Sequence, residues 1–223
     1  MDVDIKGFFD NIPHKLILES IAAKISDGNI LNLIERFLNS GVMEEGELKP
    51  TIKGTPQGGV ISPLLANIAL DHLGWYLEAK GYLFVRYADD FIVLCKSRPE
   101  AERVLDDIKI FLDKMELQIS PDKTKICHYS EGFNFLGFTI KSRSIQIRDK
   151  SKEKLLNKIR DITRRSDNLD AEVISKLNRV IRGAVNYFGT KFSTLRTFFI
   201  RLDQWIRRRI MDPKIRTYLK AQN

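Results

Sequence analysis

Two adjacent carboxylates, Asp89 and Asp90, stand between the apolar runs Tyr82–Ala88 and Phe91–Cys95. Adjacent ionised carboxylates repel each other, and burying either one costs free energy unless a cation or a hydrogen bond compensates. One interpretation is a plain hairpin turn that contains aspartates. The other is a divalent-cation site, because Mg²⁺ binds carboxylate oxygens together with substrate phosphates. Taken alone, this pair of residues leaves both interpretations open.

A metal site of this kind needs another carboxylate from a neighbouring strand, and Asp4 in the run Val3–Ile5 is the candidate. Asp2 lies on the same strand face, since side chains alternate along a strand. Asp10 is a nearby alternative, although we favour it as a capping or turn residue before Pro13. Two Mg²⁺ ions held by carboxylates from separate strands can activate a 3′-hydroxyl and stabilise a departing pyrophosphate. The pattern therefore suggests phosphoryl transfer.

The loop from Gly54 to Pro63 contains residue types suited to a phosphate-bearing ligand. Gly58 and Gly59 allow the backbone to approach a ligand closely. Gln57 offers an amide donor and acceptor, and the start of the following helix favours a phosphate. A purely structural loop is the alternative when this segment is taken alone.

The elements that must position these residues form a mixed set. Helical spacing of apolar residues predicts helices around 14–25, 30–38, 63–80 and 99–115, with a hairpin or loop over 41–56. In the third of these helices, the residues that step by four and three are Ile61, Leu65, Ile68, His72 and Trp75. Short strands are expected at 3–9, 82–88, 91–95, 123–129, 133–140 and 144–148. Beyond Ser151 the pattern is helical only, with three apolar stripes.

Composition excludes several classes of protein. The 223 residues are 43% hydrophobic and 30% charged, which excludes a disordered or collagen-like chain. No apolar run approaches the roughly 18–20 residues that a membrane span needs, and no segment resembles a signal peptide. The two cysteines, Cys95 and Cys127, lie in apolar segments. We therefore expect free thiols in a reducing, cytoplasmic compartment.

Charge is distributed unevenly along the chain. Residues 1–140 carry 15 basic and 21 acidic side chains, a net of −6, whereas residues 141–223 carry 22 basic and 8 acidic side chains, a net of +14. A basic C-terminal third on an acidic body favours binding to a polyanion, with nucleic acid preferred over a merely solubilising surface.

Four runs together resemble a reverse transcriptase, and closely the kind encoded by group II introns. They occur in the order found in that family: Asp4–Ile12, Thr55–Asn67, Tyr87–Asp90 and Phe135–Phe138. The runs Ile181–Phe188 and Leu202–Arg209 are similar to the maturase thumb of these proteins. The resemblance implies an α+β fold. Residues 1–149 would form a polymerase palm (motifs A to E), with helices on one face of an antiparallel sheet and carboxylates on the open face, and residues 150–223 a basic, all-helical thumb.

The implied activity is RNA-directed DNA polymerisation by two-metal nucleotidyl transfer. By resemblance, Asp4, Asp89 and Asp90 are the metal carboxylates of the palm, with Asp4 and Asp89 as the principal ligands. The implied metal set is these three residues and Ile5. Lys123 matches a lysine near the triphosphate, where a role as general acid and a role as a solvated lysine both stay open. The implied cofactor is two Mg²⁺ ions, with Mn²⁺ as an alternative.

The resemblance also assigns binding residues. Phe9 matches the ring that blocks a ribose 2′-hydroxyl and so selects dNTPs, and Gln57 and Gly58 match the lining of the dNTP pocket. The primer-grip hairpin, which can equally be a core strand, is matched by Phe135, Leu136, Gly137 and Phe138. The arginines expected to face nucleic acid are Arg160, Arg164, Arg165, Arg201, Arg207, Arg208 and Arg209. Trp205 and Tyr187 can stack on bases, although core packing is the favoured interpretation.

The expected partners are an RNA template or intron RNA, a DNA primer and dNTPs, with no membrane. Met1 stands three residues before Asp4, so we expect a palm and thumb without the fingers region of the family. In the family the fingers region covers part of the palm, so its loss would expose that surface and predicts self-association. Two alternatives remain open: a catalytically silent, maturase-like RNA-binding module, and a subunit whose active site is completed by a separate fingers polypeptide.

Overall fold

The chain divides into two compact units, residues 1–127 and 128–223, each of which is considered by itself. The computed structural model describes residues 1–44, 47–49, 51–55, 59–164 and 171–210. Sequence alone places the boundary between palm and thumb at 149. The two divisions differ by a three-stranded sheet that lies in the second unit, where its strands contact the helices that follow.

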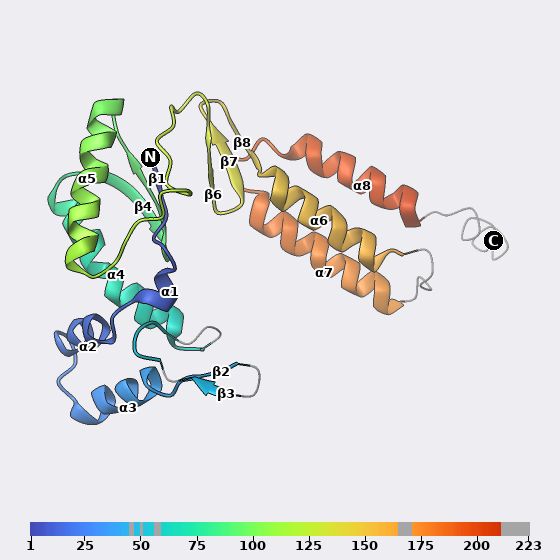
Figure 1. Cartoon of the computed structure of the whole chain (residues 1–223). Helices are drawn as coiled ribbons and strands as arrows, with labels where there is room; N and C mark the ends of the chain where they lie inside the picture. Colours follow the sequence, from blue (N-terminus) through green and yellow to red (C-terminus); the bar gives the residue numbers. More distant parts are fainter. Residues whose placement is uncertain (45–46, 50, 56–58, 165–170, 211–223) are drawn as a thin grey trace, which may run out of the picture. The chain divides into compact units, whose positions relative to one another are not determined.

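The first unit combines short strands with helices (Figure 1). In chain order its elements are β1 (Asp2–Val3), α1 (Phe8–Asn11), α2 (His14–Ala22), α3 (Gly28–Leu38), β2 (Val42–Glu44), β3 (Glu47–Lys49), α4 (Ser62–Ala79), β4 (Leu83–Tyr87), β5 (Asp90–Leu94) and α5 (Arg98–Lys114). Capping residues account for two of the helix starts. Asp27 accepts hydrogen bonds from the first turn of α3, and the Ser97 hydroxyl accepts one from the first turn of α5.

The central sheet of the first unit is antiparallel and has the strand order β1-β5-β4. Phe91 and Val93 of β5 are fully buried in the core that also contains the inward residues of α4 and α5. On the other face, Leu83, Val85 and Tyr87 of β4 are 55–70% exposed. The expected antiparallel sheet with helices on one face and one open face is therefore confirmed.

Helix α4 buries only part of the stripe that the apolar spacing indicated. Leu65 of that stripe is buried, but Trp75 is 64% exposed and its indole nitrogen donates to Asp71, whereas Leu73 and Leu77, outside the stripe, are buried. The helix is apolar on several sides, so stripes that step by three and four can be drawn along more than one face. Only packing against the sheet decides which face is buried.

Two expected strands are shorter than their apolar runs. β1 ends at Val3 because Gly7 adopts φ +51° and α1 begins at Phe8. The segment 123–129 forms no named strand, and only Lys125 pairs with Asp2 through two backbone hydrogen bonds of 2.8 Å. The backbone N–H groups of Lys123 and Thr124 instead donate to the carbonyl of Ser120, so the segment begins in a turn over 120–124.

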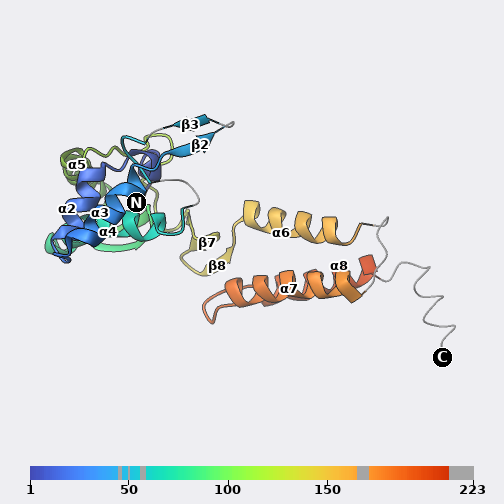
Figure 2. The same cartoon turned by 90° about the horizontal axis from the view of Figure 1, so that it is seen from below.

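The second unit contains a three-stranded antiparallel meander followed by three helices. Its elements are β6 (Phe133–Phe135), β7 (Phe138–Lys141), β8 (Ser144–Ile147), α6 (Asp149–Ile162), α7 (Ala171–Phe188) and α8 (Arg196–Ile210). Figures 1 and 2 show the three helices running side by side. Their inward stripes, which include Leu155, Ile159, Leu177 and Leu202, share one core. The three helices expected beyond Ser151 are present.

Within the residues that the structure describes, no helix is both long and apolar enough to cross a membrane. Cys95 and Cys127 are free thiols, each partly buried. Burial raises the pKa of the Cys95 thiol above its ordinary value. The cytoplasmic location expected from these cysteines stays a prediction.

Candidate functional site

The register of the central sheet places the acidic side chains along β1 and β5. Asp2 pairs with Ile92 and Val3 with Phe91, and the same register sets Asp4 level with Asp90. Because side chains alternate along strands and directly paired residues share a face, Asp2, Asp4 and Asp90 belong to one face of the sheet. This face is the one opposite the buried Phe91 side chain.

The hairpin turn between β4 and β5 lies one residue earlier than expected. Tyr87 pairs with Asp90, so the two turn residues are Ala88 and Asp89, and Asp90 begins β5. Ala88 has φ +55°, a left-handed conformation that residues other than glycine rarely adopt. Asp89 is therefore carried on a strained turn, a feature that the apolar run around it does not reveal.

Arg86 holds this turn in place. Its guanidinium donates to the carbonyl of Ala88 (3.1 Å) and to the side-chain oxygen of Asn67 on α4 (2.9 Å). Burial lowers the pKa of Arg86 from its ordinary value, although an arginine stays protonated at neutral pH. Sequence reasoning missed this residue. The signal available was an arginine that interrupts an apolar strand directly before the paired aspartates.

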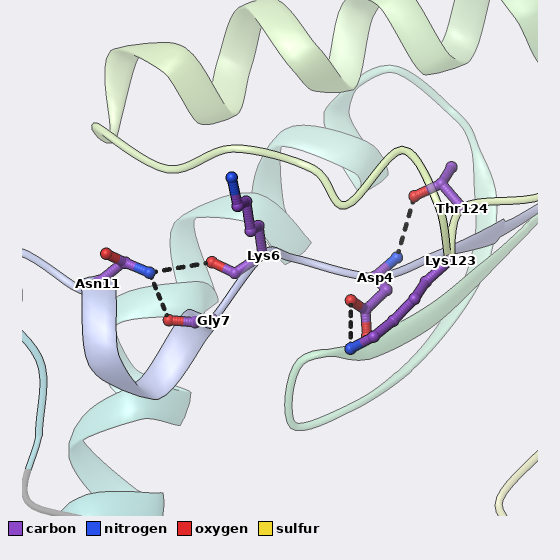
Figure 3. Close-up of polar contacts among 6 residues, drawn as sticks. All are labelled: Asp4, Lys6, Gly7, Asn11, Lys123 and Thr124. Carbon is purple, nitrogen blue, oxygen red and sulfur yellow. Dashed lines mark hydrogen bonds and ion pairs between the residues drawn. The ribbon is translucent and has the colours of Figure 1, made fainter.

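Asp4 is held by the segment that follows α5. Lys123 Nζ lies 3.2 Å from Asp4 Oδ2 and 3.4 Å from Oδ1, and the backbone N–H of Asp4 donates to the Thr124 hydroxyl (Figure 3). The Asp4 side chain is 17% exposed and that of Lys123 is 69% exposed. Asp4 Oδ2 is buried and accepts no hydrogen bond. The Lys123 ammonium is thus the counter-charge of a largely buried carboxylate.

The carboxylates on this face can be compared with the ligands that a divalent cation requires. Within the described residues, no three histidine, cysteine, aspartate or glutamate side chains are gathered closely enough to hold a metal. Mg²⁺ commonly takes only one or two protein carboxylates and completes its shell with waters and substrate phosphates. Asp4 Oδ2, buried without a hydrogen bond, is an acceptor that such a cation would satisfy. The residues therefore fit a divalent cation that shares its ligands with a phosphate substrate.

Ionisation of Asp2, on the same face, is unfavourable in the folded protein. Burial raises the pKa of Asp2 above its ordinary value of 3.8, and the neighbouring Asp90 raises it further. Asp4 adds to this effect, while the N-terminal ammonium and Lys125 oppose it. These like charges disfavour the ionised form of Asp2, and a cation bound beside them would relieve the repulsion.

The chain between Asp4 and Phe9 makes a tight turn. Gly7 adopts φ +51°, and the side-chain nitrogen of Asn11 donates to the carbonyls of Lys6 (3.2 Å) and Gly7 (2.9 Å) (Figure 3). The turn starts α1, which carries Phe9 half-buried with its ring edge-on to Phe8. Phe9 is thereby fixed a short distance along the chain from Asp4.

The loop that contains the expected dNTP-pocket residues is tied to α1. The N–H of Gly54 donates to the carbonyl of Ile12, and the N–H of Thr55 donates to the carbonyl of Phe9, each at 2.7 Å. The ring Nε2 of His14 lies 2.8 Å from the Gly54 carbonyl, which accepts its hydrogen bond. Gln57 and Gly58 themselves lie outside the described residues. The structure therefore describes the start of this loop beside Phe9, and not the two residues singled out for the pocket.

Gly54 cannot be another residue without a backbone shift. It adopts φ +83°, and a Cβ added to it would lie 2.7 Å from the carbonyl carbon and oxygen of Asp10. Sequence reasoning assigned the close approach to Gly58 and Gly59. The structure adds Gly54, whose need for glycine comes from the backbone of α1 rather than from a ligand.

In the second unit, the hairpin expected around Phe135–Phe138 is present. Leu136 and Gly137 both have positive φ, as a two-residue hairpin turn of the primed type requires. The hydroxyl of Tyr187 donates to the carbonyl of Leu136 (3.0 Å), and the N–H of Arg148 donates to that of Gly137 (2.9 Å). The turn is thus held by α7 and by the residue before α6.

A groove of 730 Å³ runs from this turn between α6 and α7, and we call it the α6–α7 groove. Its apolar floor includes Leu155, Val180 and Ala184. Its cations are Lys154 and Lys158 of α6 and Lys176 and Arg179 of α7. Four cations along an apolar floor suit a ligand that presents both phosphates and apolar edges. Sequence reasoning did not select these residues, although the four-residue spacing of Lys154 and Lys158 indicates one helix face.

Most of the arginines that were expected to contact nucleic acid have partners inside the unit. Arg164 pairs with Asp161 and Arg207 with Asp203, each at 2.8 Å. Among the described residues, the contact of Arg208 is a long one of 3.4 Å to the carbonyl of Gln204. Arg165 lies outside the described residues. Because such exposed ion pairs are weak, each arginine can exchange its aspartate for a phosphate at small cost.

Arg209 and the two aromatic candidates are engaged in packing. The guanidinium of Arg209 donates to the hydroxyl and carbonyl of Thr163, which ends α6. Arg160 and Arg209 both lie over the Trp205 ring, at 5.8 and 5.2 Å from its centroid. The Tyr187 ring stacks on Phe138 at 5.9 Å. These rings support the fold where they stand.

Family models match most of the chain. One described as reverse transcriptase (RNA-dependent DNA polymerase) matches residues 1–140. One described as group II intron, maturase-specific domain, matches residues 152–222. The first match contains the acidic face and the loop tied to α1, and the second contains the three helices.

Individual relatives agree with these matches. The group II intron-encoded protein LtrA of Lactococcus lactis subsp. cremoris is 27% identical over 296 residues, which covers 87% of this chain and 49% of LtrA. Protein YkfC of Escherichia coli (strain K12) is 30% identical over 170 residues, covering 60% of this chain and 44% of YkfC. The chain spans about half the length of these curated relatives.

Among solved structures, apo telomerase from Candida tropicalis matches with a TM-score of 0.55 at 16% identity, covering 92% of this chain and 45% of that chain. A truncated form of that telomerase matches with a TM-score of 0.52 at 21% identity, covering 66% of this chain and 35% of that chain. At these identities the likeness concerns the fold alone.

Replacing Gly54 with alanine tests the tie between the loop and α1. The added methyl would overlap the Asp10 backbone at a positive φ, so we expect Gly54→Ala to lower stability by about 1–3 kcal/mol. Gly28→Ala is the matched control, because nothing lies within 4 Å of its added Cβ and its stability should be unchanged or slightly higher. Equal melting temperatures for Gly54→Ala and the wild type would contradict this account.

The raised pKa of Asp2 gives a pH dependence whose sign can be worked out. The folded state holds this proton more tightly than the unfolded state, so stability falls as pH rises from 3.8 through the raised pKa. Asp2→Asn removes that cost, and we expect it to raise the melting temperature at pH 7 in the presence of EDTA. The gain should shrink as the pH is lowered towards 3.8. A lower melting temperature than the wild type at pH 7 would refute the assignment, and Asp122→Asn, at an exposed site, serves as control.

Proposed function

Because the chain belongs to the reverse transcriptase (RNA-dependent DNA polymerase) family and also matches the group II intron maturase-specific domain, we propose that it performs RNA-directed DNA synthesis. In this proposal, residues 1–149 act as the palm and residues 150–223 as the thumb of an intron-type reverse transcriptase/maturase. The observation that carries the proposal is the buried Oδ2 of Asp4, which faces the exposed Lys123 ammonium at 3.2 Å, on a strand whose register places it on the same face of the sheet as Asp90.

The proposed metal ligands are the carboxylates of Asp4, Asp89 and Asp90 together with the backbone carbonyl of Ile5, with Asp4 and Asp89 as the principal pair. Mg²⁺ or Mn²⁺, two ions in this proposal, would lower the pKa of a primer 3′-hydroxyl and neutralise charge on the departing pyrophosphate. The rigid β1–β5 register and the strained Ala88 turn fix the carboxylates before a substrate arrives. Such preorganisation supports nucleotidyl transfer, because little reorganisation is left for the reaction step.

Lys123 has two proposed tasks in sequence. Without a cation, its ammonium compensates the Asp4 carboxylate at 3.2 Å. When a cation takes over that carboxylate, the flexible and exposed lysine is released towards the triphosphate, where it can stabilise charge or donate a proton. Its 69% exposure leaves it free to move between the two positions.

The dNTP is proposed to bind beside α1. Phe9 is fixed there by the Gly7 turn and by its own carbonyl, which accepts from Thr55. A ring in this place would exclude a ribose 2′-hydroxyl and so favour dNTPs. Gln57 and Gly58 continue the loop that Thr55 begins, which supports them as further pocket residues.

We propose that the α6–α7 groove and the Leu136–Gly137 turn hold a primer–template duplex. The four groove cations form no ion pair with a described residue, which favours their use in phosphate contacts. Phosphate contacts of this kind set position and give binding a strong dependence on salt. The proposed ligands are an RNA template or intron RNA paired with a DNA primer.

A second candidate function is a maturase-like RNA-binding module without polymerase activity. The net charge of +14 over residues 141–223 favours it, because RNA binding requires nothing from the acidic face. A further polypeptide, such as separate fingers or a second copy, is the proposed cover for Leu83, Val85 and Tyr87 on the open face of the sheet.

Primer extension on an RNA template tests the proposed activity. We expect Mg²⁺-dependent extension by the wild type, and a loss of about 100-fold or more in Asp89→Asn, the scale expected when one electrostatic group of the transition state is removed. Asp122→Asn, at an exposed carboxylate outside the site, should extend primers normally. Absence of extension by the wild type, with salt-sensitive RNA binding retained in every variant, would favour the RNA-binding module instead.

A second test concerns the counter-charge of Asp4. Lys123→Met leaves the carboxylate without its cation, and we expect a stability loss on the order of 1 kcal/mol in EDTA, modest because the lysine is largely exposed. Added Mg²⁺ should raise the melting temperature of Lys123→Met more than that of the wild type or of Lys123→Arg. Equal Mg²⁺-induced shifts in all three proteins would show that the cation does not replace Lys123 at Asp4.

A further inference from the structure

The second unit has another hollow on a different side of α6. It measures 450 Å³ and lies between the end of β8, α6 and α8, and we call it the α6–α8 hollow. The α6 residues that line the α6–α7 groove are Ser151, Lys154, Leu155 and Lys158, and those that line the α6–α8 hollow are Asp149, Lys152, Leu156 and Arg160. At 3.6 residues per turn these two sets point in nearly opposite directions from the helix axis. Figure 1 shows α7 and α8 on two sides of α6.

Cations and aromatic rings alternate in the α6–α8 hollow. Lys152 lies over the Phe198 ring at 5.7 Å, and Arg160 lies over the Trp205 ring at 5.8 Å. Arg201 also lines the hollow, is exposed, and makes no ion pair or hydrogen bond with a described residue. The lining of the hollow therefore contains three cations and one carboxylate, that of Asp149. The hollow carries a net positive charge on surfaces that a planar base can contact.

The neutral polar groups of the hollow favour a nucleotide over an acidic peptide. Gln146 and Thr197 line it and offer both donors and acceptors, which suit the edge of a base. The carboxylates of an acidic peptide would be recognised by the cations, whereas the neutral groups Gln146 and Thr197 match the mixed donors and acceptors of a base edge. A concave volume of 450 Å³ lies in the range of small-ligand sites and can admit an unstacked nucleotide, whereas a duplex presents its bases stacked and paired.

We propose that the α6–α8 hollow binds an unpaired segment of RNA, at a site separate from the α6–α7 groove. The proposal rests on the proposed function, in which the α6–α7 groove holds a duplex, and adds a second ligand on the other side of α6. Arg201 contacts a phosphate, and the surface formed by Phe198 and Lys152 receives a base. The unit then holds a duplex and a single strand at the same time, which allows one protein to stay on its RNA while a primer is bound.

Two charge reversals on opposite sides of α6 separate the two sites. Arg201→Glu alters the α6–α8 hollow and Lys158→Glu the α6–α7 groove, while Lys191→Glu reverses an exposed charge of the same unit that lines neither. Binding of the full chain is measured by fluorescence anisotropy at fixed salt with two probes, a ten-nucleotide single-stranded RNA and a blunt RNA–DNA hybrid. Circular dichroism checks that each variant is folded.

We expect Arg201→Glu to weaken binding of the single-stranded RNA about 10-fold and that of the hybrid less than 2-fold, with the reverse for Lys158→Glu and neither change for Lys191→Glu. With the neutral variant Arg201→Gln, the slope of log K against log salt for the single strand should fall by about 0.7, the value for one lost phosphate contact. These assays need no dNTP or metal, so they remain interpretable if the chain does not polymerise.

Three results would overturn the proposal. Unchanged binding of single-stranded RNA by Arg201→Glu would show that the hollow does not hold RNA. Equal weakening of both probes by Arg201→Glu and Lys158→Glu would indicate one continuous surface instead of two sites. Displacement of the single strand by a poly-glutamate peptide at equal concentration of anionic groups would indicate a general site for acidic chains.

Discussion

The backbone pairing of β1 with β5 is the constraint on which the candidate active site depends. Val3 is buried opposite Phe91, so the residues on either side of Val3, both aspartates, must emerge on the open face of the sheet. A one-residue slip of β1 would turn both carboxylates towards the core and the Val3 side chain away from it. The burial of Val3 and Phe91 therefore fixes the face on which the neighbouring carboxylates lie.

The ion pair between the Asp4 carboxylate and the Lys123 ammonium stabilises the site when no cation is bound. Asp4 is largely buried, and an uncompensated carboxylate in that position would destabilise the fold. Lys123 supplies a counter-charge that is exposed, flexible and easily displaced, in contrast to a buried arginine. In this account, the Asp4 carboxylate pairs with Lys123 before a cation binds and becomes a ligand of the cation afterwards. In the second unit, the lysines of the α6–α7 groove form no ion pair with a described residue, whereas the Arg209 guanidinium donates hydrogen bonds to Thr163 at the end of α6.

The sequence predicts the elements better than the faces they bury. The helices and the antiparallel hairpin around Asp89 were predictable, because caps, apolar spacing and the family resemblance agree. The inward face of α4 was not, since Leu73 and Trp75 are both apolar and only packing separates them. Ala88, with its positive φ, and the contact of Lys123 with Asp4 depend on residues distant in the chain, so local patterns carry no trace of them. The basic surface was predictable in charge but not in detail, because arginines such as Arg164 and Arg207 pair with aspartates three or four residues earlier in the chain.

The central claim is that divalent cations replace Lys123 at Asp4 on the open face of the sheet. Anomalous X-ray scattering from Mn²⁺, in crystals of the full chain with an RNA–DNA primer–template and a dNTP, tests it most directly. The account predicts anomalous density within ligand distance of Asp4 and Asp89, with the Lys123 ammonium withdrawn from Asp4. Anomalous density elsewhere, or none, with Lys123 still paired to Asp4 in a complex that holds both substrates, would contradict it.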